Sequence, residues 1–245
     1  MKQILFLDSA EELIKGNNYI VKNKKKGGIT VSHFKVSDDN YKVLKRSRGD
    51  YYTITFSKEI LTKYPKRIEK SVISVLKQLF TGYKYNKTLI VGLGNSDIPS
   101  DAIGPRTTNK IIATNHYNDF LTIPKVALFV PEVTSKTGIN SISLIKMVVN
   151  NLKPDIIIVI DSLLTNKEQR LNTTIEVSDT GLIPGSALYT NREINAKTFG
   201  IPLIAIGIPL VIKKDNNLYT SVDINETLDI LSNILSSSLN SLFLA

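Results

Sequence analysis

From residue 88 onward, the chain alternates short apolar runs with longer stretches in which apolar residues recur every three or four positions. Short apolar runs are typical of buried strands, and the helical spacing is typical of helices that cover a sheet. The clearest strand is residues 156–160, which are β-branched throughout and apolar on both faces, as in an interior parallel strand. The same pattern predicts further strands at residues 88–91, 125–130, 173–177 and 203–208.

The spacing of apolar residues also predicts three helices, at residues 101–115, 140–151 and 225–242. Residues 179–199 are too rich in glycine, asparagine and serine for a regular element, so they are predicted to form a surface loop. Because strands that alternate with helices are typical of parallel sheets, the sequence predicts an α/β fold, with a mostly parallel sheet flanked by helices.

The N-terminal part has a different pattern. Residues 30–56 alternate apolar and polar positions, most clearly over 51–56, which predicts an antiparallel β subdomain. With 245 residues and 42% hydrophobic content, the chain is long enough to bury one large core. We therefore expect one α/β domain over residues 1–245, with a basic, β-rich part at 1–87 and the parallel sheet at 88–245.

Composition excludes several kinds of chemistry. The chain has no cysteine, so disulfides, cysteine-ligated metals and a thiol nucleophile are excluded. The longest apolar run, residues 203–212, is too short to span a bilayer, and the first residues lack the apolar stretch of a signal peptide. We therefore expect a cytoplasmic protein without a membrane partner.

The positive charge lies in the first third of the chain. Residues 1–87 hold 19 lysines and arginines against 8 acidic residues, whereas residues 88–245 hold 12 against 14. The basic cluster consists of Lys22, Lys24, Lys25, Lys26, Lys42, Lys45, Arg46 and Arg48. Such a cluster predicts a weak or indirect contact with DNA, or with an acidic substrate. The alternative is an ordinary solvated, lysine-rich surface.

Two aspartates follow predicted parallel strands: Asp101 in the turn after residues 88–91, and Asp161 directly after residues 156–160. In an open parallel sheet, ligands bind beyond the carboxyl ends of the strands. If these strands are neighbours, one carboxyl retains a proton, because two adjacent negative charges are unfavourable. Peptide hydrolysis requires one carboxylate that activates water and one protonated carboxyl that donates. Asp101 and Asp161 are therefore candidate catalytic residues, and 88–245 is the predicted catalytic sheet.

Simpler roles exist for these residues. Asp101 is also a suitable helix cap, Asp161 a suitable strand end, and Asp97 and Asp179 lie near the same region. A metal site built from Asp101, Asp161 and Glu132 is a further alternative, because hard cations bind oxygen ligands and need no histidine.

Other familiar sites are excluded by their missing residues. The turn Gly92-Leu93-Gly94 resembles the start of a dinucleotide fingerprint, but Asp97 stands where the third glycine is required, and no Walker-type motif is present. His33 and His116 lie far apart, and neither follows a predicted strand. The sequence therefore predicts no nucleotide cofactor, no histidine-based catalytic triad and no histidine-based metal site.

Ordered motifs over residues 30–212 resemble those of the spore germination protease family. The matching segments are Gly49-Asp50-Tyr51, Val91-Gly92-Leu93-Gly94-Asn95, Asp101-Ala102-Ile103-Gly104-Pro105-Arg106, Pro131-Glu132-Val133, Ile160-Asp161-Ser162-Leu163, Asn172-Thr173-Thr174-Ile175, Ser178-Asp179-Thr180-Gly181, Pro184-Gly185-Ser186 and Gly200-Ile201-Pro202. A further segment, Lys136-Thr137-Gly138-Ile139, is similar to the family's Gln-Thr-Gly-Ile, with lysine in place of glutamine.

The resemblance implies an aspartic-type endopeptidase that hydrolyses small acid-soluble spore proteins, the DNA-coating proteins of dormant spores, during germination. It implies that Asp101 and Asp161 are the catalytic pair, without cofactor or metal. Asn95, Arg106, Glu132 and Ser186 lie in matching motifs and are expected to shape the site or bind substrate. The family also implies synthesis as a zymogen, homo-oligomers, location in the forespore or spore core, and a fold similar to hydrogenase maturation proteases.

Some residues depart from the family pattern. Leu210 replaces a usual threonine, Lys213 and Lys214 replace a usual Asp-Ala, and no Thr-Asp-Leu-Ala type processing sequence is found near the start. Two alternatives therefore stay open. One is a non-catalytic, sporulation-associated binding protein, and the other is a metal-dependent maturation peptidase of the same fold.

Overall fold

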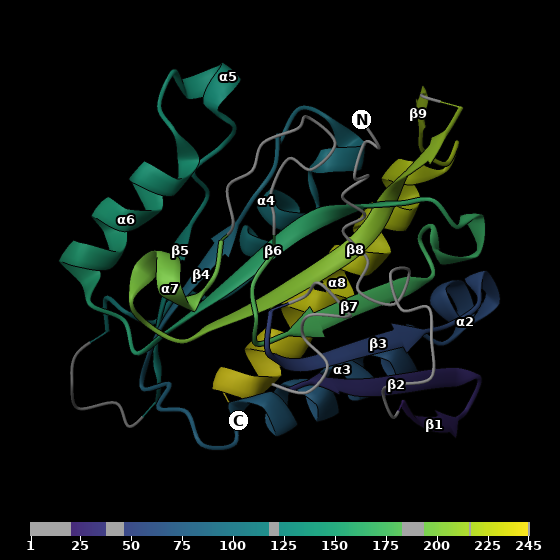
Figure 1. The fold of residues 1–245 in the computed structure, drawn as a ribbon, viewed down its shortest axis with the longest axis horizontal. Helices are drawn as coiled ribbons and strands as arrows, with labels where there is room; N and C mark the ends of the chain where they lie inside the picture. The colour runs from purple at the N-terminus through teal and green to yellow at the C-terminus, as the bar shows by residue number, and fades with distance from the viewer. Residues whose placement is uncertain (1–20, 38–46, 118–122, 183–193, 216, 245) are drawn as a thin grey trace.

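The computed structural model describes residues 21–37, 47–117, 123–182, 194–215 and 217–244. Within these residues, nine strands form one sheet in the order β1-β2-β3-β7-β8-β6-β4-β5, and β9 pairs with β8 (Figure 1). The strands are β1 Lys22–Lys26, β2 Ile29–Val36, β3 Gly49–Thr55, β4 Lys87–Gly92, β5 Lys125–Phe129, β6 Ile156–Thr165, β7 Thr174–Ser178, β8 Leu203–Lys214 and β9 Asn217–Tyr219.

Helices cover both faces of this sheet. Figure 1 shows α3 and α8 behind the sheet, with α6 and α7 on the near side. The described helices are α2 Lys58–Lys63, α3 Pro65–Phe80, α4 Ile103–Thr108, α5 Thr134–Thr137, α6 Ser141–Leu152, α7 Ala196–Phe199 and α8 Ile224–Phe243, with 3-10 turns η2 Pro99–Asp101 and η3 Glu168–Arg170. No described helix combines the length and the apolar character that a bilayer crossing requires.

The sheet is mixed, and its two halves differ in strand direction. Strands β5, β4, β6 and β8 are parallel to one another. Strands β1, β2, β3 and β7 are antiparallel to their neighbours, and β7 joins the two halves by pairing with β8. The predicted α/β class is therefore confirmed. The N-terminal antiparallel strands are present, and they continue the main sheet because β3 pairs with β7.

Two apolar clusters fill the space on either side of the sheet. The larger one lies between the sheet and helices α3 and α8. The smaller one joins Ile157 and Val159 of β6 to Ile145 and Val149 of α6. Residues 156–160 have no solvent exposure on either face, so the predicted interior strand is confirmed.

Several element boundaries differ from the prediction. The helix predicted at residues 101–115 is wrong: α4 ends at Thr108. The chain is drawn instead to the sheet edge, where the backbone N–H groups of Thr114 and Asn115 both donate to the carbonyl of Val126. Strand β6 extends to Thr165, because it keeps pairing with β8 after its pairing with β4 has ended.

Residues 58–80, within the part predicted to be β-rich, form α2 and α3. Helix α3 buries Ile68, Val72, Leu76 and Leu79, which recur every three or four positions along the helix. This spacing is the helical signal in the sequence. Part of the N-terminal third is therefore a covering layer for the sheet.

Candidate active site

Asp161 marks the point at which β6 outruns its neighbour β4. The last paired residue of β4 is Gly92, which lies opposite Ile160, so Asp161 is the first residue of β6 beyond the end of β4. Asp161 pairs with Gly207 of β8, and the residue is only 4% exposed. Because side chains alternate along a strand, Asp161 shares the α6 side of the sheet with Val159. Its Oδ1 accepts a hydrogen bond of 2.9 Å from the backbone N–H of Ser162.

Asp101 is held by the loop that follows β4. Its Oδ2 accepts a 2.8 Å hydrogen bond from the backbone N–H of Asn95. The loop comes this close because residue 94 is glycine: its φ is 114°, and a Cβ there would lie 1.9 Å from the carbonyl oxygen of Asp101. A side chain at Gly94 is therefore incompatible with the loop around Asp101.

A second glycine allows α4 to pack directly against the strand ends. A Cβ at Gly104 would lie 2.2 Å from the carbonyl oxygen of Leu93 and 2.5 Å from that of Ile160. The turn η2, which carries Asp101, contacts both β6 and β8. Asp101 and Asp161 therefore lie at the same carboxyl edge of the parallel strands, and their catalytic roles stay predictions.

Burial changes the acidity of Asp101. The pKa of this carboxyl is raised to about 6, mainly by burial and to a smaller extent by the negative charge of Glu132, whereas the hydrogen bond from Asn95 acts in the opposite direction. A carboxyl with this pKa holds a proton through mildly acidic pH and still exchanges it near neutrality. The expected sharing of one proton between Asp101 and Asp161 stays a prediction.

Glu132 follows β5 and reaches the same loop. Its backbone is left-handed, with φ at 57°, a strained conformation for a residue with a side chain. Its Oε2 accepts the backbone N–H of Ser96 at 3.3 Å and lies 3.2 Å from Nζ of Lys136. The Ser96 hydroxyl, followed by Lys136, lowers the pKa of Glu132. Asp101 and Glu132 are thus neighbouring carboxyls whose environments shift their pKa values in opposite directions.

The other predicted binding residues have different surroundings. The Arg106 guanidinium donates to Asp229 Oδ1 at 2.8 Å and to Asn225 Oδ1 at 3.1 Å, which ties α4 to α8. The side-chain oxygen of Asn95 accepts the backbone N–H of Asp97 at 3.0 Å and so shapes the loop. Ser186 lies outside the described residues, as do Lys42, Lys45 and Arg46 of the basic cluster.

Two further residues named from the sequence belong to the antiparallel half. Nε2 of His33 lies 2.7 Å from Oδ1 of Asp50, and Oδ1 of Asp179 accepts the backbone N–H of Asp50 at 2.8 Å. Asp179 therefore links β3 to the end of β7. Across the described ranges of the chain, no group of three or more histidine and acidic side chains is arranged to hold a metal ion.

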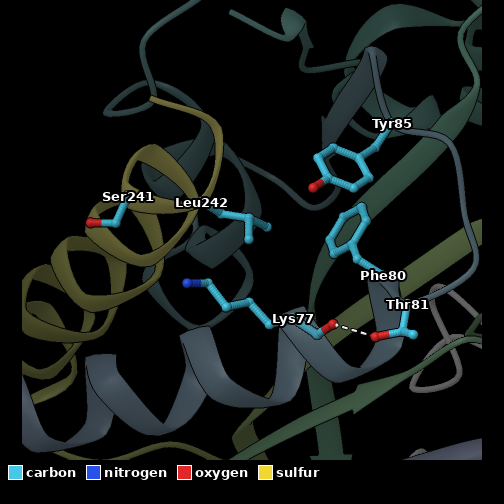
Figure 2. Close-up of a pocket in the computed structure, with 6 residues that line it drawn as sticks. All are labelled: Lys77, Phe80, Thr81, Tyr85, Ser241 and Leu242. Carbon is cyan, nitrogen blue, oxygen red and sulfur yellow. Dashed lines mark hydrogen bonds between the residues drawn. The ribbon is translucent and has the colours of Figure 1, made fainter. Parts of the chain in front are cut away.

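A cavity of about 360 Å³ lies at the opposite end of the sheet (Figure 2). Its lining comes from the ends of α3 and α8 and from the segment before β4, through Lys77, Phe80, Thr81, Tyr85, Ser241 and Leu242. Tyr85 precedes β4, whereas Asp101 follows it. This cavity is therefore separate from the candidate active site.

Sequence reasoning missed the part played by Lys136. Its Nζ lies 3.0 Å from Oδ2 of Asp97 and donates to the Ser96 hydroxyl at 3.0 Å, in addition to its contact with Glu132. The one available signal was the lysine itself, in a segment where the resembling family has glutamine.

Comparison with known proteins identifies the family. The family model described as germination protease matches residues 6–235. The chain belongs to the germination protease family. The sequence is 35% identical over 196 residues to the germination protease of Caldanaerobacter subterraneus subsp. tengcongensis, a match that covers 76% of this chain and 60% of that protein. It is also 35% identical over 202 residues to the germination protease of Clostridium tetani, covering 78% of this chain and 62% of that protein.

The chain thus spans about 60% of the length of these family relatives. Among solved structures, it is similar to a NiFe hydrogenase maturation protease from Thermococcus kodakarensis KOD1, with 19% sequence identity and a TM-score of 0.42. That match covers 67% of this chain and 98% of the maturation protease chain.

Proposed function

We propose that this protein is an endopeptidase that hydrolyses small acid-soluble spore proteins during germination, with Asp101 and Asp161 as the catalytic pair. The family supports peptidase activity, because its relatives carry the name germination protease. The observation that carries the aspartic mechanism is the environment of Asp101. Burial raises its pKa to about 6, and it lies at the same sheet edge as the buried Asp161.

The two aspartates divide the work of hydrolysis. Asp161 takes a proton from water, whose oxygen attacks the carbonyl carbon of the scissile peptide bond. Asp101 donates its proton to the leaving nitrogen as the carbon–nitrogen bond breaks, and the two carboxyls exchange one proton to restore the starting state. Burial keeps Asp101 protonated, with a smaller contribution from the negative charge of Glu132, and Asn95 orients the Asp101 carboxyl through its backbone N–H.

The experiment is to incubate the purified chain and its Asp101→Asn and Asp161→Asn variants with a small acid-soluble spore protein, and to map fragments by mass spectrometry. Each substitution is expected to lower the cleavage rate by about 100-fold or more, the usual contribution of a general acid or base. Asp215→Asn is a matched control, because this exposed aspartate lies in the β8–β9 turn.

Full cleavage by both the Asp101→Asn and the Asp161→Asn variants would contradict the catalytic pair. No cleavage by the parent chain would favour the binding protein, and loss of cleavage on chelation would favour a metal-dependent peptidase.

The finer properties that the family resemblance implies are also proposals: synthesis as a zymogen, homo-oligomers, and location in the cytoplasm of the forespore and spore core. Size-exclusion chromatography with light scattering tests the oligomer, and N-terminal sequencing before and after germination tests the removal of a propeptide. A monomer at micromolar concentration, or an unchanged N-terminus in germinating spores, would contradict the respective property.

A second proposal concerns DNA, and the exposed edge of the antiparallel half favours it. All five residues of β1 are exposed, and four of them are lysines. The edge is extended by α3, whose Arg67 donates to the carbonyl of Gly27 at 3.2 Å in the β1–β2 turn. Regularly spaced cations on an accessible ribbon attract the phosphates of nucleic acid. We infer that this edge contacts DNA weakly, which would bring the protease to DNA-bound substrates.

Fluorescence anisotropy with a double-stranded oligonucleotide tests the contact. If four phosphates are neutralised, the affinity should fall about 100-fold between about 50 and 200 mM salt. Replacing the four β1 lysines by glutamine should remove most of the binding, and the Lys146→Gln, Lys153→Gln and Lys197→Gln triple variant on the other half is the control. Unchanged binding would instead favour a role of these lysines in preventing edge-to-edge association.

A further inference from the structure

Lys136 joins two loops that are separate in the sequence. It lies in α5, the short helix between β5 and α6, and its Nζ contacts the Ser96 hydroxyl and the Asp97 carboxylate of the β4–η2 loop, each at 3.0 Å. The same Nζ lies 3.2 Å from Glu132, in its own loop. One ammonium group therefore holds three oxygen atoms, two from the β4 loop and one from the β5 loop.

The β4–η2 loop leads directly to the candidate catalytic group. Ser96, which Lys136 contacts, follows Asn95, whose backbone N–H donates to Oδ2 of Asp101. Ser96 is also held from the other side, since its backbone N–H donates to Glu132. A displacement of this loop would therefore loosen the hydrogen bond that orients the Asp101 carboxyl.

The Glu132 loop is itself firmly held. The Glu132 backbone carbonyl accepts the Ser141 hydroxyl at 2.8 Å, at the first residue of α6. Its φ of 57° is a strained conformation that persists only where the surroundings determine it. Glu132 thus provides a fixed point, and Lys136 links the β4–η2 loop to it.

We propose that Lys136 is a positioning residue, which ties the β4–η2 loop to Glu132 and thereby sets the orientation and charge environment of Asp101. The role in catalysis rests on the proposed function, but the effect on the Asp101 carboxyl does not. A single exposed ion pair would contribute little, whereas three acceptors on one cation form a small network that fixes a geometry.

The electrostatic consequence has a definite sign. Glu132 is the charged group that raises the pKa of Asp101, and the groups that face Glu132 are Lys136, Ser96 and, through Lys136, Asp97. Removing the ammonium leaves the charge of Glu132 uncompensated and loosens the Asn95 hydrogen bond. Both changes favour the protonated form of Asp101, so its pKa should rise.

Three substitutions separate the contributions of Lys136. Lys136→Met removes both the charge and the hydrogen bonds, Lys136→Gln retains hydrogen bonding with the side chain typical of the resembling family, and Lys136→Arg retains the charge. Lys146→Met is the matched control, because Lys146 is exposed on the neighbouring helix α6. Thermal unfolding of each variant verifies that the fold is intact.

The first measurement is independent of activity. The titration of the Asp101 carboxyl is followed by carbon NMR, with Asp101→Asn for the assignment. In Lys136→Met the midpoint should rise by about 0.5 pH unit, a typical size for the loss of a nearby charge at a partly exposed site. Lys136→Arg should retain the parent midpoint, and adding Glu132→Gln to Lys136→Met should remove the part of the rise that comes from the Glu132 charge. An unchanged midpoint in Lys136→Met overturns the proposal.

The second measurement uses cleavage of a spore-protein substrate. Lys136→Met should lower kcat by about 10-fold with little change in KM, since a displaced catalytic group impairs the chemical step. The pH at which the rate falls because Asp101 loses its proton should rise together with the midpoint measured by NMR. If KM alone changes, Lys136 binds substrate and the positioning role is rejected. If the parent chain does not cleave at all, the proposed function fails, and the NMR titration still decides the role of Lys136.

Discussion

The carboxyl edge of the parallel strands and the outer edge of the antiparallel strands place their polar residues in opposite environments. In the parallel half, the buried strands β4 and β6 run to one edge, where Asp161 is 4% exposed and burial raises the pKa of Asp101 to about 6. In the antiparallel half, the last strand, β1, is exposed along its whole length and carries four lysines. Buried carboxyls acquire new acidity because they lose water, whereas exposed lysines act through a field that salt screens. The parallel half therefore offers buried carboxyls that can transfer protons, whereas the outer edge of the antiparallel half offers cations that can attract anions.

The largest effect should come from adding a side chain at Gly104, where α4 packs directly against the strand ends beneath the candidate active site. Gly104→Ala places a Cβ within 2.5 Å of the backbone carbonyls of Leu93 and Ile160, so α4 must move away from the β4–η2 loop and from β6. We expect a loss of about 3 kcal/mol in the free energy of unfolding, together with loss of cleavage. Urea unfolding measures this loss in the free energy of unfolding. Gly138→Ala is the control, since a Cβ there meets open space and only its φ of 70° is unfavourable, at a cost of about 1 kcal/mol. Equal losses would contradict the close-packing explanation.

The pH dependence of cleavage tests whether burial provides the acid. Because the protonated form of Asp101 donates in the proposed mechanism and its pKa is raised to about 6, the rate should fall as pH rises above about 6. Each further pH unit should then lower kcat/KM by about 10-fold. Rates measured from pH 5 to about 8 decide this, with Asp215→Asn as the control. A rate that increases over the whole range would show that Asp101 acts in its ionised form.

The buried carboxyl should also cost stability at neutral pH. In the folded protein the pKa of Asp101 is raised from 3.8 to about 6. The protonated carboxyl therefore contributes fully to the free energy of unfolding below pH 3.8, and this contribution is lost as the pH rises through about 6. Asp101→Asn removes the charge, and the free energy of unfolding at pH 7 should rise by about 1–3 kcal/mol. The gain should vanish near pH 4 in denaturant titrations. A variant that is less stable at pH 7 would contradict the sign.

The smallest effect is expected at the lysine edge. Replacing the four β1 lysines by glutamine should change the free energy of unfolding by less than about 0.5 kcal/mol, because the side chains are exposed. Cleavage of a short peptide should proceed at the parent rate, while cleavage of a DNA-bound substrate should slow at low salt. If cleavage of the short peptide and of the DNA-bound substrate slows to the same extent, the lysine edge takes part in the chemical step. That result would contradict separate roles for the two halves.

Local patterns were sufficient for the elements whose stability comes from a continuous apolar face. The β-branched run of β6 was predicted at its observed position, and α6 and α8 were each predicted to within one residue at each end. The helix expected at 101–115 failed because Thr114 and Asn115 bond to β5, a partner that the local spacing does not reveal. Tertiary pairing there outweighs helix propensity.

At the candidate active site, too, some features follow from local patterns and others only from tertiary contacts. Asp101 and Asp161 were selected as candidates because each follows a predicted strand, and parallel strands end at a common edge. The contacts of Lys136 were missed, because Ser96 and Lys136 are 40 residues apart and meet only when β4 and β5 pair. Arg106 was expected to shape the site or bind substrate, and it contacts α8, which lies more than 100 residues later in the chain.

The sequence by itself determined the α/β class, the interior strand and the positions at which two aspartates follow strands, because apolar periodicity is a local property that sets where buried strands end. Tertiary structure decided the mixed sheet, the tie between Lys136, Glu132 and the loop around Asp101, and the acidity of Asp101 itself. These features depend on burial and on distances between atoms from different strands. Such quantities exist only after the chain has packed.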